Sequence, residues 1–496
     1  MFKTITPEQA GISSRAVEKF IRKLEQRGLY THGLLLARGD SIFCESYWAP
    51  YNKDSLNRMY SQTKSFEAIG ICLLAAEGKL SLDDRIADHF PEKISRELPP
   101  FLQEQTIRQM LNMQTTGLPP TWFDDETAID RTEHYLRCAA GKRAPGLIWE
   151  YDSAGSQVMA SLVEKLSGMR MLDYLKSKLF DTMGTFRTAT ILKTRNGDSW
   201  GDSAMICTLR DVASFGWLLM NGGKYQDQQL IPAELVAEAT SPMVDNDENG
   251  FGDNFHSYGY GYQIWHFLDG FAFVGMGCQL TIAFPSRNLV FSIVSDNQGS
   301  YDDTAYAMIQ ACLHDFILDE LTDSPLPEDP EAYASLQALS DSLQLKYIAG
   351  ATDSPFRSQL NGRRYLCDEN PTGITEFTLR FQDDNTGVFC YRNAQGYKEL
   401  PFGLGKNVFG KFPQAGYANL YGGLSGGDDF YYDCAASAAW REEKKLLLKV
   451  QVIDKYLGNM VAIFSFRDDI ACVKMVKTAE DFLDEYQGWI NAKAEI

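Results

Sequence analysis

The sequence predicts an α/β domain, in which an antiparallel sheet is flanked by helices and carries a helical lobe, followed by a smaller all-β, barrel-like domain. Strand-like segments occur near both ends of residues 1–322, and helical periodicity fills the middle of that range. A segment rich in proline and acidic residues, 323–330, then interrupts the pattern. Beyond it, apolar and polar residues alternate with the period of strands.

These observations divide the chain into three parts. Residues 1–322 form the first domain, residues 323–346 a linker with a connecting helix, and residues 347–496 a β-barrel with a final helix near 479–492. The first domain begins with a helix and a hairpin, and it ends with three strands and a helix. In order, these segments are 14–27, 32–47, 271–275, 279–284, 289–295 and 304–321.

A helix predicted over 66–80 follows directly on the tetrad Ser61-Gln62-Thr63-Lys64, and Gly78 is placed to stop it. If Ser61 opens this helix, Lys64 lies one turn later and within reach of the serine hydroxyl. A serine becomes a useful nucleophile only when a neighbouring base takes its proton. Lysine can be that base when burial or a nearby cation lowers its pKa.

The plain alternative for this pair is a helix cap followed by a solvated lysine. Two observations favour the chemical interpretation. No other Ser-x-x-Lys occurs in the chain, and the helix that follows is apolar enough to be interior.

A second candidate group lies at 146–153, an irregular stretch ahead of a helix predicted over 156–168. It presents Tyr151 and Ser153, and loops held by rigid elements often carry reactive side chains. A phenol with a pKa near 10 becomes a useful base only beside a cation such as that of Lys64. A core tyrosine with a satisfied hydroxyl fits the same pattern.

The net charge of -19 and the isoelectric point near 4.8 argue against nucleic acid or an anionic membrane as partner. The N-terminal segment has no apolar signal-peptide core, and no run approaches the length of a spanning helix. We therefore expect a cytoplasmic protein. The ten cysteines are scattered singly, so we expect reduced thiols, no structural metal and no cofactor.

Several motifs in order resemble the serine β-lactamase and penicillin-binding-protein-like superfamily, particularly its class C and family VIII esterase branch. The resemblance covers the first domain, and the segment from Asn361 resembles the lipocalin-like domain of some members. The motifs are Ser61–Lys64, Gly78–Asp84, Thr106–Arg108, Gly117–Leu118, Pro145–Gly146, Tyr151–Ser153, Leu209–Asp211 and Gly275-x-Gly277-x-Gln279.

This resemblance implies roles for individual residues. Ser61 would be the acylated nucleophile, Lys64 its partner base, and Tyr151 the general base and acid. The backbone N–H groups of Ser61 and Met276 would form the oxyanion hole.

Two positions depart from the family's pattern. Ser153 stands where class C enzymes carry asparagine, and Phe273-Val274-Gly275 replaces the strand motif Lys-Thr-Gly or His-x-Gly. Ser153, Phe273 and Gly275 are nevertheless the expected substrate-binding positions. Without a basic side chain at Phe273 nothing there would grip a substrate carboxylate, which argues against β-lactams and D-Ala-D-Ala peptides.

The leading hypothesis is a serine hydrolase that acts on a small ester, amide or peptide. The alternatives are a non-catalytic member that binds a ligand or partner, and a true β-lactamase or D,D-peptidase. The oligomeric state is left open. Tyr417-Ala418-Asn419 also fits the tyrosine motif but is interpreted as a chance match. Some aromatic residues fit either an apolar pocket or the core, namely Trp122, Phe123, Tyr260, Tyr262 and Trp265.

Overall fold

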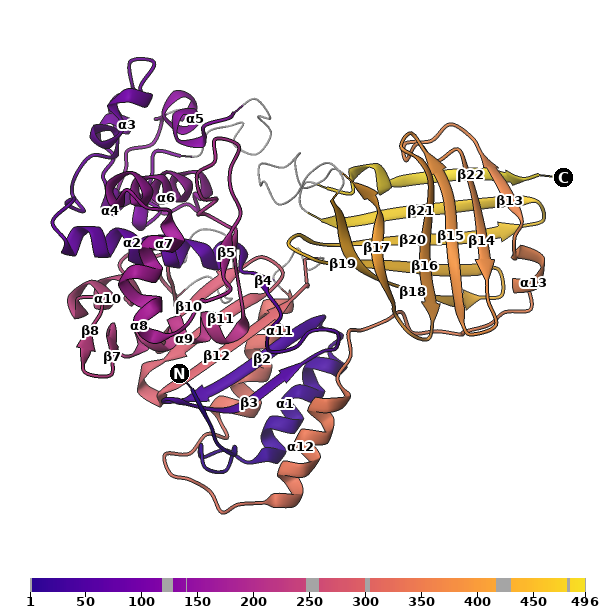
Figure 1. Cartoon of the computed structure of the whole chain (residues 1–496), viewed down its shortest axis with the longest axis horizontal. Helices are drawn as coiled ribbons and strands as arrows, with labels where there is room; N and C mark the ends of the chain where they lie inside the picture. Colours follow the sequence, from indigo (N-terminus) through magenta and orange to yellow (C-terminus); the bar gives the residue numbers. More distant parts are fainter. Residues whose placement is uncertain are drawn as a thin grey trace. The chain divides into compact units, whose positions relative to one another are not determined.

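The computed structural model describes residues 2–117, 128–139, 141–246, 258–298, 304–415, 430–479 and 482–495. These residues separate into two compact units, one reaching from the N-terminus to Gln344 and one starting at Leu345. The first unit is an α/β structure with a helical lobe, and the second is all-β (Figure 1). The fold class expected from the sequence is confirmed.

The central sheet of the first unit joins both ends of that unit. Its strand order is β1-β3-β2-β12-β11-β10-β9, and the pairs are antiparallel except β1 with β3. Strand β12 pairs with β2, so that Leu289 lies opposite Arg38. The strands span Lys3–Thr4 (β1), Thr31–Arg38 (β2), Ser41–Tyr47 (β3), Trp265–Phe267 (β9), Gly270–Gly275 (β10), Gln279–Phe284 (β11) and Leu289–Ser295 (β12).

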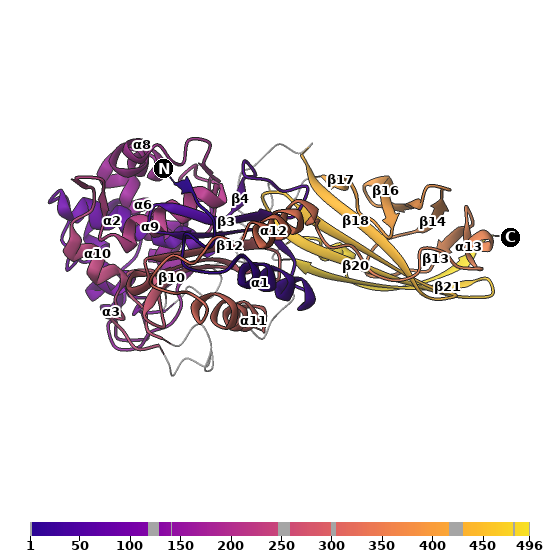
Figure 2. The same cartoon turned by 90° about the horizontal axis from the view of Figure 1, so that it is seen from below.

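Both faces of this sheet are buried, because successive residues of a strand point to opposite sides. Leu34 and Leu36 enter one hydrophobic core, whereas Leu35 and Ala37 enter the other. Figures 1 and 2 show the strands between two groups of helices. One group comprises α1 (Ser14–Gln26), α11 (Thr304–Leu313) and α12 (Pro330–Ser342), and the other includes α2 (Thr63–Ala76) and α9 (Leu209–Met220).

The helical lobe is inserted between β3 and β9, and its centre is the packing of α2 on α6 (Ser153–Ser167). The two helices approach closely at Gly70, where an added Cβ would lie 3.1 Å from Val163. The remaining helices of the lobe are α3 (Pro100–Glu104), α4 (Ile107–Leu111), α5 (Arg131–Cys138), α7 (Met171–Leu175), α8 (Asp181–Met183) and α10 (Ala233–Thr240). Short strands pair beside them: β4 (Asn57–Arg58), β5 (Thr190–Ile191), β6 (Met205–Cys207), β7 (Lys224–Tyr225) and β8 (Gln228–Gln229).

The second unit is a closed barrel. Its strand order is β16-β15-β14-β13-β22-β21-β20-β19-β18-β17, and a parallel pairing of β16 with β18 closes the ring. A short helix, α13 (Arg357–Leu360), precedes the strands. They span Arg364–Cys367 (β13), Glu376–Phe381 (β14), Thr386–Asn393 (β15), Gly396–Leu404 (β16), Val408–Ala415 (β17), Tyr431–Glu442 (β18), Lys445–Ile453 (β19), Leu457–Arg467 (β20), Ile470–Ala479 (β21) and Gly488–Ala494 (β22).

The expected final helix near 479–492 is wrong. The chain ends in strand β22, which pairs with both β13 and β21. Ile490 and Ala492 are buried, while Trp489 and Lys493 face solvent, which is the two-residue period of a strand. This strand joins the first strand of the barrel to the last hairpin, a pairing between distant segments that a local pattern does not reveal.

The connecting helix exists, as α12, but it does not lie in a linker. It packs on α1 in the first unit, and Leu336 belongs to the same core as α1 and α11. The boundary between the units therefore follows Gln344 instead of beginning at Asp323. The proline and acid content that suggested a boundary at 323–330 marks a surface connection between helices.

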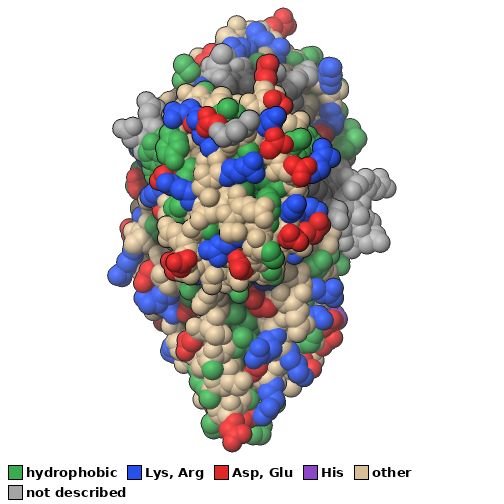
Figure 3. Space-filling model, turned by 90° about the vertical axis from the view of Figure 1, so that its right-hand side faces the viewer, with side chains coloured by type: hydrophobic (Ala, Val, Ile, Leu, Met, Phe, Trp, Pro, Cys, Tyr) green, Lys and Arg blue, Asp and Glu red, His purple; other side chains and the backbone are tan. Residues whose placement is uncertain are grey.

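Charged side chains of both signs are interspersed on the face drawn in Figure 3. On the barrel, Arg364 forms ion pairs with Glu376 and Glu495 across neighbouring strands. Among the described residues, no helix combines the length and the apolar character that crossing a bilayer requires.

Phe66, the one aromatic residue of α2, should be sensitive to truncation. Its side chain is fully buried, and its ring lies 4.2 Å from that of Phe215 and 5.5 Å from that of Phe186, measured between centroids. Truncation in Phe66→Ala should lower the free energy of unfolding by about 3–5 kcal/mol in urea titrations. Phe101→Ala, at a 38% exposed position of the same unit, should change it by about 0.5 kcal/mol or less. Equal effects of the two substitutions would contradict the packing described here.

Candidate active site

Ser61 lies in a tight 3₁₀ turn, Tyr60–Gln62, that precedes α2, so it does not open the α-helix itself. Tyr60 adopts a left-handed conformation with φ of 48°. The Thr63 hydroxyl donates a hydrogen bond of 2.6 Å to the Tyr60 carbonyl, and the Arg58 guanidinium covers the Tyr60 ring. Tyr60 and Gln62 are buried while Ser61 retains exposed surface, so the turn presents the serine hydroxyl.

Lys64 is almost completely buried and points its ammonium at the serine. Its Nζ donates to Ser61 Oγ at 3.0 Å and to the Asp202 carbonyl at 2.8 Å, and it lies 4.0 Å from Asp202 Oδ2. The spacing of the tetrad predicted the contact with Ser61. Nothing in the spacing identified Asp202, which belongs to a polar segment far along the chain.

Tyr151 joins this pair from the segment ahead of α6. Its ring centroid lies 5.0 Å from Lys64 Nζ, and the ring stacks on Trp265 with a centroid separation of 5.9 Å. The structure therefore brings Lys64 together with both Ser61 and Tyr151. The Tyr151 ring has its other neighbours in Trp149 and the buried aromatic core around it.

The electrostatics at Lys64 differ from the expectation that burial would neutralise it. Burial is the largest influence and lowers the pKa of Lys64, but Tyr151 and Asp202 raise that pKa by more. The pKa of Lys64 is therefore raised above its ordinary value. Lys64 is accordingly described as an ammonium that donates a hydrogen bond to Ser61.

Glu67 is a buried acid that the sequence interpretation missed. It follows Lys64 on α2, is fully buried, and within the described ranges neither carboxyl oxygen has a hydrogen-bond partner. Burial raises the pKa of Glu67 well above its ordinary value, Lys64 opposes this, and Asp202 adds to it. Glu67 is thus held in its neutral form. Its only signal in the sequence is a single acid inside an apolar helical segment.

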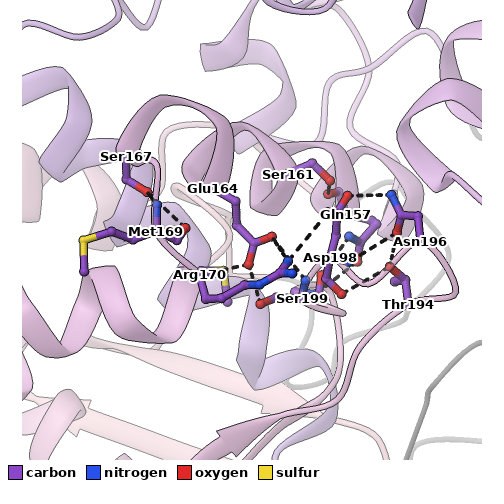
Figure 4. A network of polar contacts seen from close by, with 12 residues as sticks. Gln157, Ser161, Glu164, Ser167, Met169, Arg170, Thr194, Asn196, Asp198 and Ser199 are labelled. Atoms are coloured by element: carbon purple, nitrogen blue, oxygen red, sulfur yellow. Dashed lines mark hydrogen bonds and ion pairs between the residues drawn. The ribbon is translucent and has the colours of Figure 1, made fainter.

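Helix α6 holds the segment that carries Asp202 (Figure 4). Gln157 donates from Nε2 to the Ser199 carbonyl at 3.0 Å and accepts at Oε1 from the Gly201 N–H at 3.0 Å. Glu164 Oε1 accepts from the Ser199 hydroxyl at 2.6 Å. Because Tyr151 lies just before the same helix, α6 positions two neighbours of Lys64 at once.

Gly275, at the end of β10, lies against the serine turn. A Cβ at Gly275 would come within 2.2 Å of the Met59 carbonyl oxygen and 3.3 Å of the Gln62 nitrogen. Only a residue without a side chain permits this approach. Met276 follows directly and is 36% exposed, so the backbone expected to supply the second oxyanion donor borders the turn of Ser61.

The side chain of Phe273, which was expected at a substrate-binding position, has no exposed surface. It packs in the core, 5.3 Å from Phe215 and 6.5 Å from Phe66 between ring centroids. Ser153 is partly exposed as the first residue of α6. Asp152 caps that helix by accepting from the Gly155 N–H at 2.8 Å.

The remaining aromatic candidates that the structure describes, Tyr260, Tyr262 and Trp265, are 5% exposed or less and belong to the core. Residues 118–127 and 416–429 lie outside the described residues. The motif residue Leu118, the aromatic candidates Trp122 and Phe123, and the second tyrosine motif at 417–419 fall there.

Comparison with known proteins finds a family match for the N-terminal part of the chain. The beta-lactamase family matches residues 17–312. The chain is 25% identical to 6-aminohexanoate-dimer hydrolase of Paenarthrobacter ureafaciens over 282 residues, which is 52% of this chain and 71% of that protein. It is 31% identical to penicillin-binding protein 4* of Bacillus subtilis over 150 residues, 28% of this chain and 31% of that protein.

Solved structures agree in fold. A putative 6-aminohexanoate-dimer hydrolase from Bacillus anthracis superposes with a TM-score of 0.52 at 18% identity, covering 64% of this chain and 86% of that one. EstCE1, described as a hydrolase with promiscuous acyltransferase activity, has a TM-score of 0.50 at 14% identity and covers 61% and 99% of the two chains. At these identities the likeness concerns the fold.

Replacing Glu67 by glutamine should change how stability depends on pH. In the wild type the proton on Glu67 stabilises the folded state fully below the unfolded carboxyl pKa, and this contribution is lost as the pH rises through the raised folded pKa. Glutamine does not titrate. The free energy of unfolding of Glu67→Gln relative to wild type should therefore increase as the pH rises above about 4.3, by at most about 1.4 kcal/mol per pH unit.

Denaturant titrations across a pH series measure this difference. Glu104→Gln, which removes an exposed carboxyl at the end of α3, serves as the matched control. A pH-independent difference for Glu67→Gln would show that Glu67 is not held neutral.

Proposed function

The chain belongs to the beta-lactamase family, and we propose that it is a serine hydrolase acting through an acyl-enzyme on a small amide or ester. One observation carries this proposal. A buried, charged Lys64 donates a 3.0 Å hydrogen bond to a partly exposed Ser61 hydroxyl, with the Tyr151 ring beside the same ammonium. A solvated lysine behind a helix cap would have neither the burial nor these contacts.

The proton steps follow from the charge on Lys64. We assign the role of general base to Tyr151, which lies beside the Lys64 ammonium and takes the Ser61 proton as the hydroxyl attacks the substrate carbonyl. Tyr151 then returns the proton to the leaving amine or alcohol. Water attacks the acyl-enzyme in the second half of the reaction with Tyr151 again as base. Lys64 keeps its proton throughout and orients Ser61.

The negative charge that develops on the substrate oxygen needs donors already in place. We assign these to the backbone N–H groups of Ser61 and Met276, because the end of β10 abuts the serine turn at Gly275. These donors belong to the main chain. They are therefore present even though Phe273 stands where the family's strand motif carries a basic residue.

Two observations support small amides and esters as the substrate class. Phe273 is buried and apolar, so this strand offers no cation to a substrate carboxylate. The relative from Paenarthrobacter ureafaciens is named as a hydrolase of the 6-aminohexanoate dimer. We therefore favour small amides and esters over β-lactams. A cytoplasmic location stays a prediction from the sequence.

Ser61→Ala should abolish covalent labelling by a fluorophosphonate, because no hydroxyl remains to form the adduct. Intact-mass spectrometry of wild type and variant after labelling measures this. Ser81→Ala, an exposed serine beyond α2, should label like wild type.

Labelling that persists in Ser61→Ala would remove Ser61 from its role. If the wild type shows neither labelling nor a burst with nitrophenyl acetate or butyrate, the protein is a non-catalytic binder. Turnover of nitrocefin would instead restore the β-lactamase alternative.

Asp202→Asn should move the alkaline limb of the pH profile to lower pH. The Asp202 charge raises the pKa of Lys64, so its removal leaves the opposing effect of burial stronger and Lys64 loses its proton at lower pH. Values of kcat/KM for nitrophenyl acetate from pH 6 to 11 measure the shift, in the range of about one pH unit. Asp198→Asn, in the same segment but paired with Arg170, should leave the limb in place. An unmoved limb in Asp202→Asn would show that Lys64 does not depend on this charge.

A further inference from the structure

The peptide group that would supply the second oxyanion donor is held from its opposite end. The Met276 N–H and the Gly275 carbonyl belong to one peptide unit. The hydroxyl of Tyr306, on α11, donates to that carbonyl at 2.8 Å. A donor on the carbonyl thus lies directly across the amide from the N–H that is assigned to the oxyanion hole.

The next peptide unit is held as well. Gln279 donates from Nε2 to the Met276 carbonyl at 3.0 Å, and its Oε1 accepts from the Ser295 N–H at 3.2 Å. The Ser295 hydroxyl in turn donates to the Gly277 carbonyl at 2.7 Å. The end of β12 therefore fixes the turn between β10 and β11, and Met276 is held at both of its peptide units.

Steric contact at Gly275 also restricts movement of the Gly275–Met276 peptide. The Gly275 Cα approaches the Met59 carbonyl so closely that no Cβ fits between them. Rotation of the Gly275–Met276 peptide would break the Tyr306 hydrogen bond to the Gly275 carbonyl, and leaving a buried carbonyl unpaired costs about 1–3 kcal/mol. The N–H of Met276 consequently has one preferred direction.

We propose that Tyr306 is a positioning residue for the oxyanion-binding N–H of Met276, an inference that rests on the proposed function. Donation to the carbonyl does two things. It fixes the plane of the peptide, and it polarises the amide so that its N–H becomes a stronger donor, since hydrogen bonds in a chain strengthen one another. The stronger N–H donor stabilises the transition state, in which the substrate oxygen is charged, and does not stabilise the bound substrate in the same way.

A purely structural role for Tyr306 makes a different prediction. If the hydroxyl only fastened α11 to the sheet, its loss would lower stability and leave the ratio of transition-state to substrate binding unchanged. The two roles are therefore separated by kinetics and not by stability.

The test is Tyr306→Phe, which removes the hydroxyl and keeps the ring. With nitrophenyl acetate we expect kcat to fall about 10-fold and KM to change by less than about two-fold, because complete loss of an oxyanion donor costs about 10²–10³ in kcat and here the donor is only weakened. Affinity for a boronic acid, which forms a tetrahedral adduct at the serine, should fall by the same factor as kcat/KM.

The matched control is Tyr47→Phe, which removes a 2.7 Å hydrogen bond from another partly buried tyrosine hydroxyl, to Glu45 on β3. It should leave kcat and boronic acid affinity unchanged. Gln279→Met, at the neighbouring peptide unit, should lower both quantities in the same direction as Tyr306→Phe.

The outcomes distinguish this inference from the function on which it rests. A wild type that is not labelled at Ser61 would overturn the proposed function. A labelled wild type together with an unchanged kcat and boronic acid affinity in Tyr306→Phe would overturn only the role of Tyr306. Parallel losses in kcat and inhibitor affinity, with circular dichroism as in wild type, would establish it.

Discussion

The contact between Lys64 and Ser61 depends on keeping a cation inside the protein. The ammonium of a lysine residue that is 1% exposed is stable only where opposite charge and acceptor groups surround it. Asp202 supplies both, with its carbonyl 2.8 Å away and its carboxylate 4.0 Å away. Because Asp202 belongs to a segment held by α6, the charge state of Lys64 is tied to the packing of the helical lobe on α2.

Glu67 adds no second carboxylate charge close to the ammonium. A second ionised carboxylate would lie unpartnered in the core, so burial keeps Glu67 neutral and Lys64 pairs with Asp202. Burial lowers the pKa of Lys64, and Tyr151 and Asp202 raise it by more. The Tyr151 ring lies beside the same ammonium and stacks on Trp265.

The sheet contributes the other half of the site through its backbone. Strand β10 ends at Gly275 against the serine turn, while Phe273, two residues earlier, points into the core between the sheet and α9. The same alternation that buries Phe273 explains why the strand offers no charged side chain there. What the strand provides is a carbonyl and an N–H, and Tyr306 and Gln279 hold the peptide units that carry them.

The sequence by itself determined the elements whose signals are local. The hairpin, the helices at α1, α2 and α9, the strands β10 to β12 and the pair Ser61 and Lys64 depend on spacings of a few residues. Only the tertiary structure decided what depends on neighbours from distant segments: the final strand β22, the place of α12, the burial of Phe273, and the roles of Asp202 and Glu67 at Lys64. The physical reason is that periodicity reports which face of an element is buried, whereas a pKa or a strand pairing depends on what the rest of the chain places against that face.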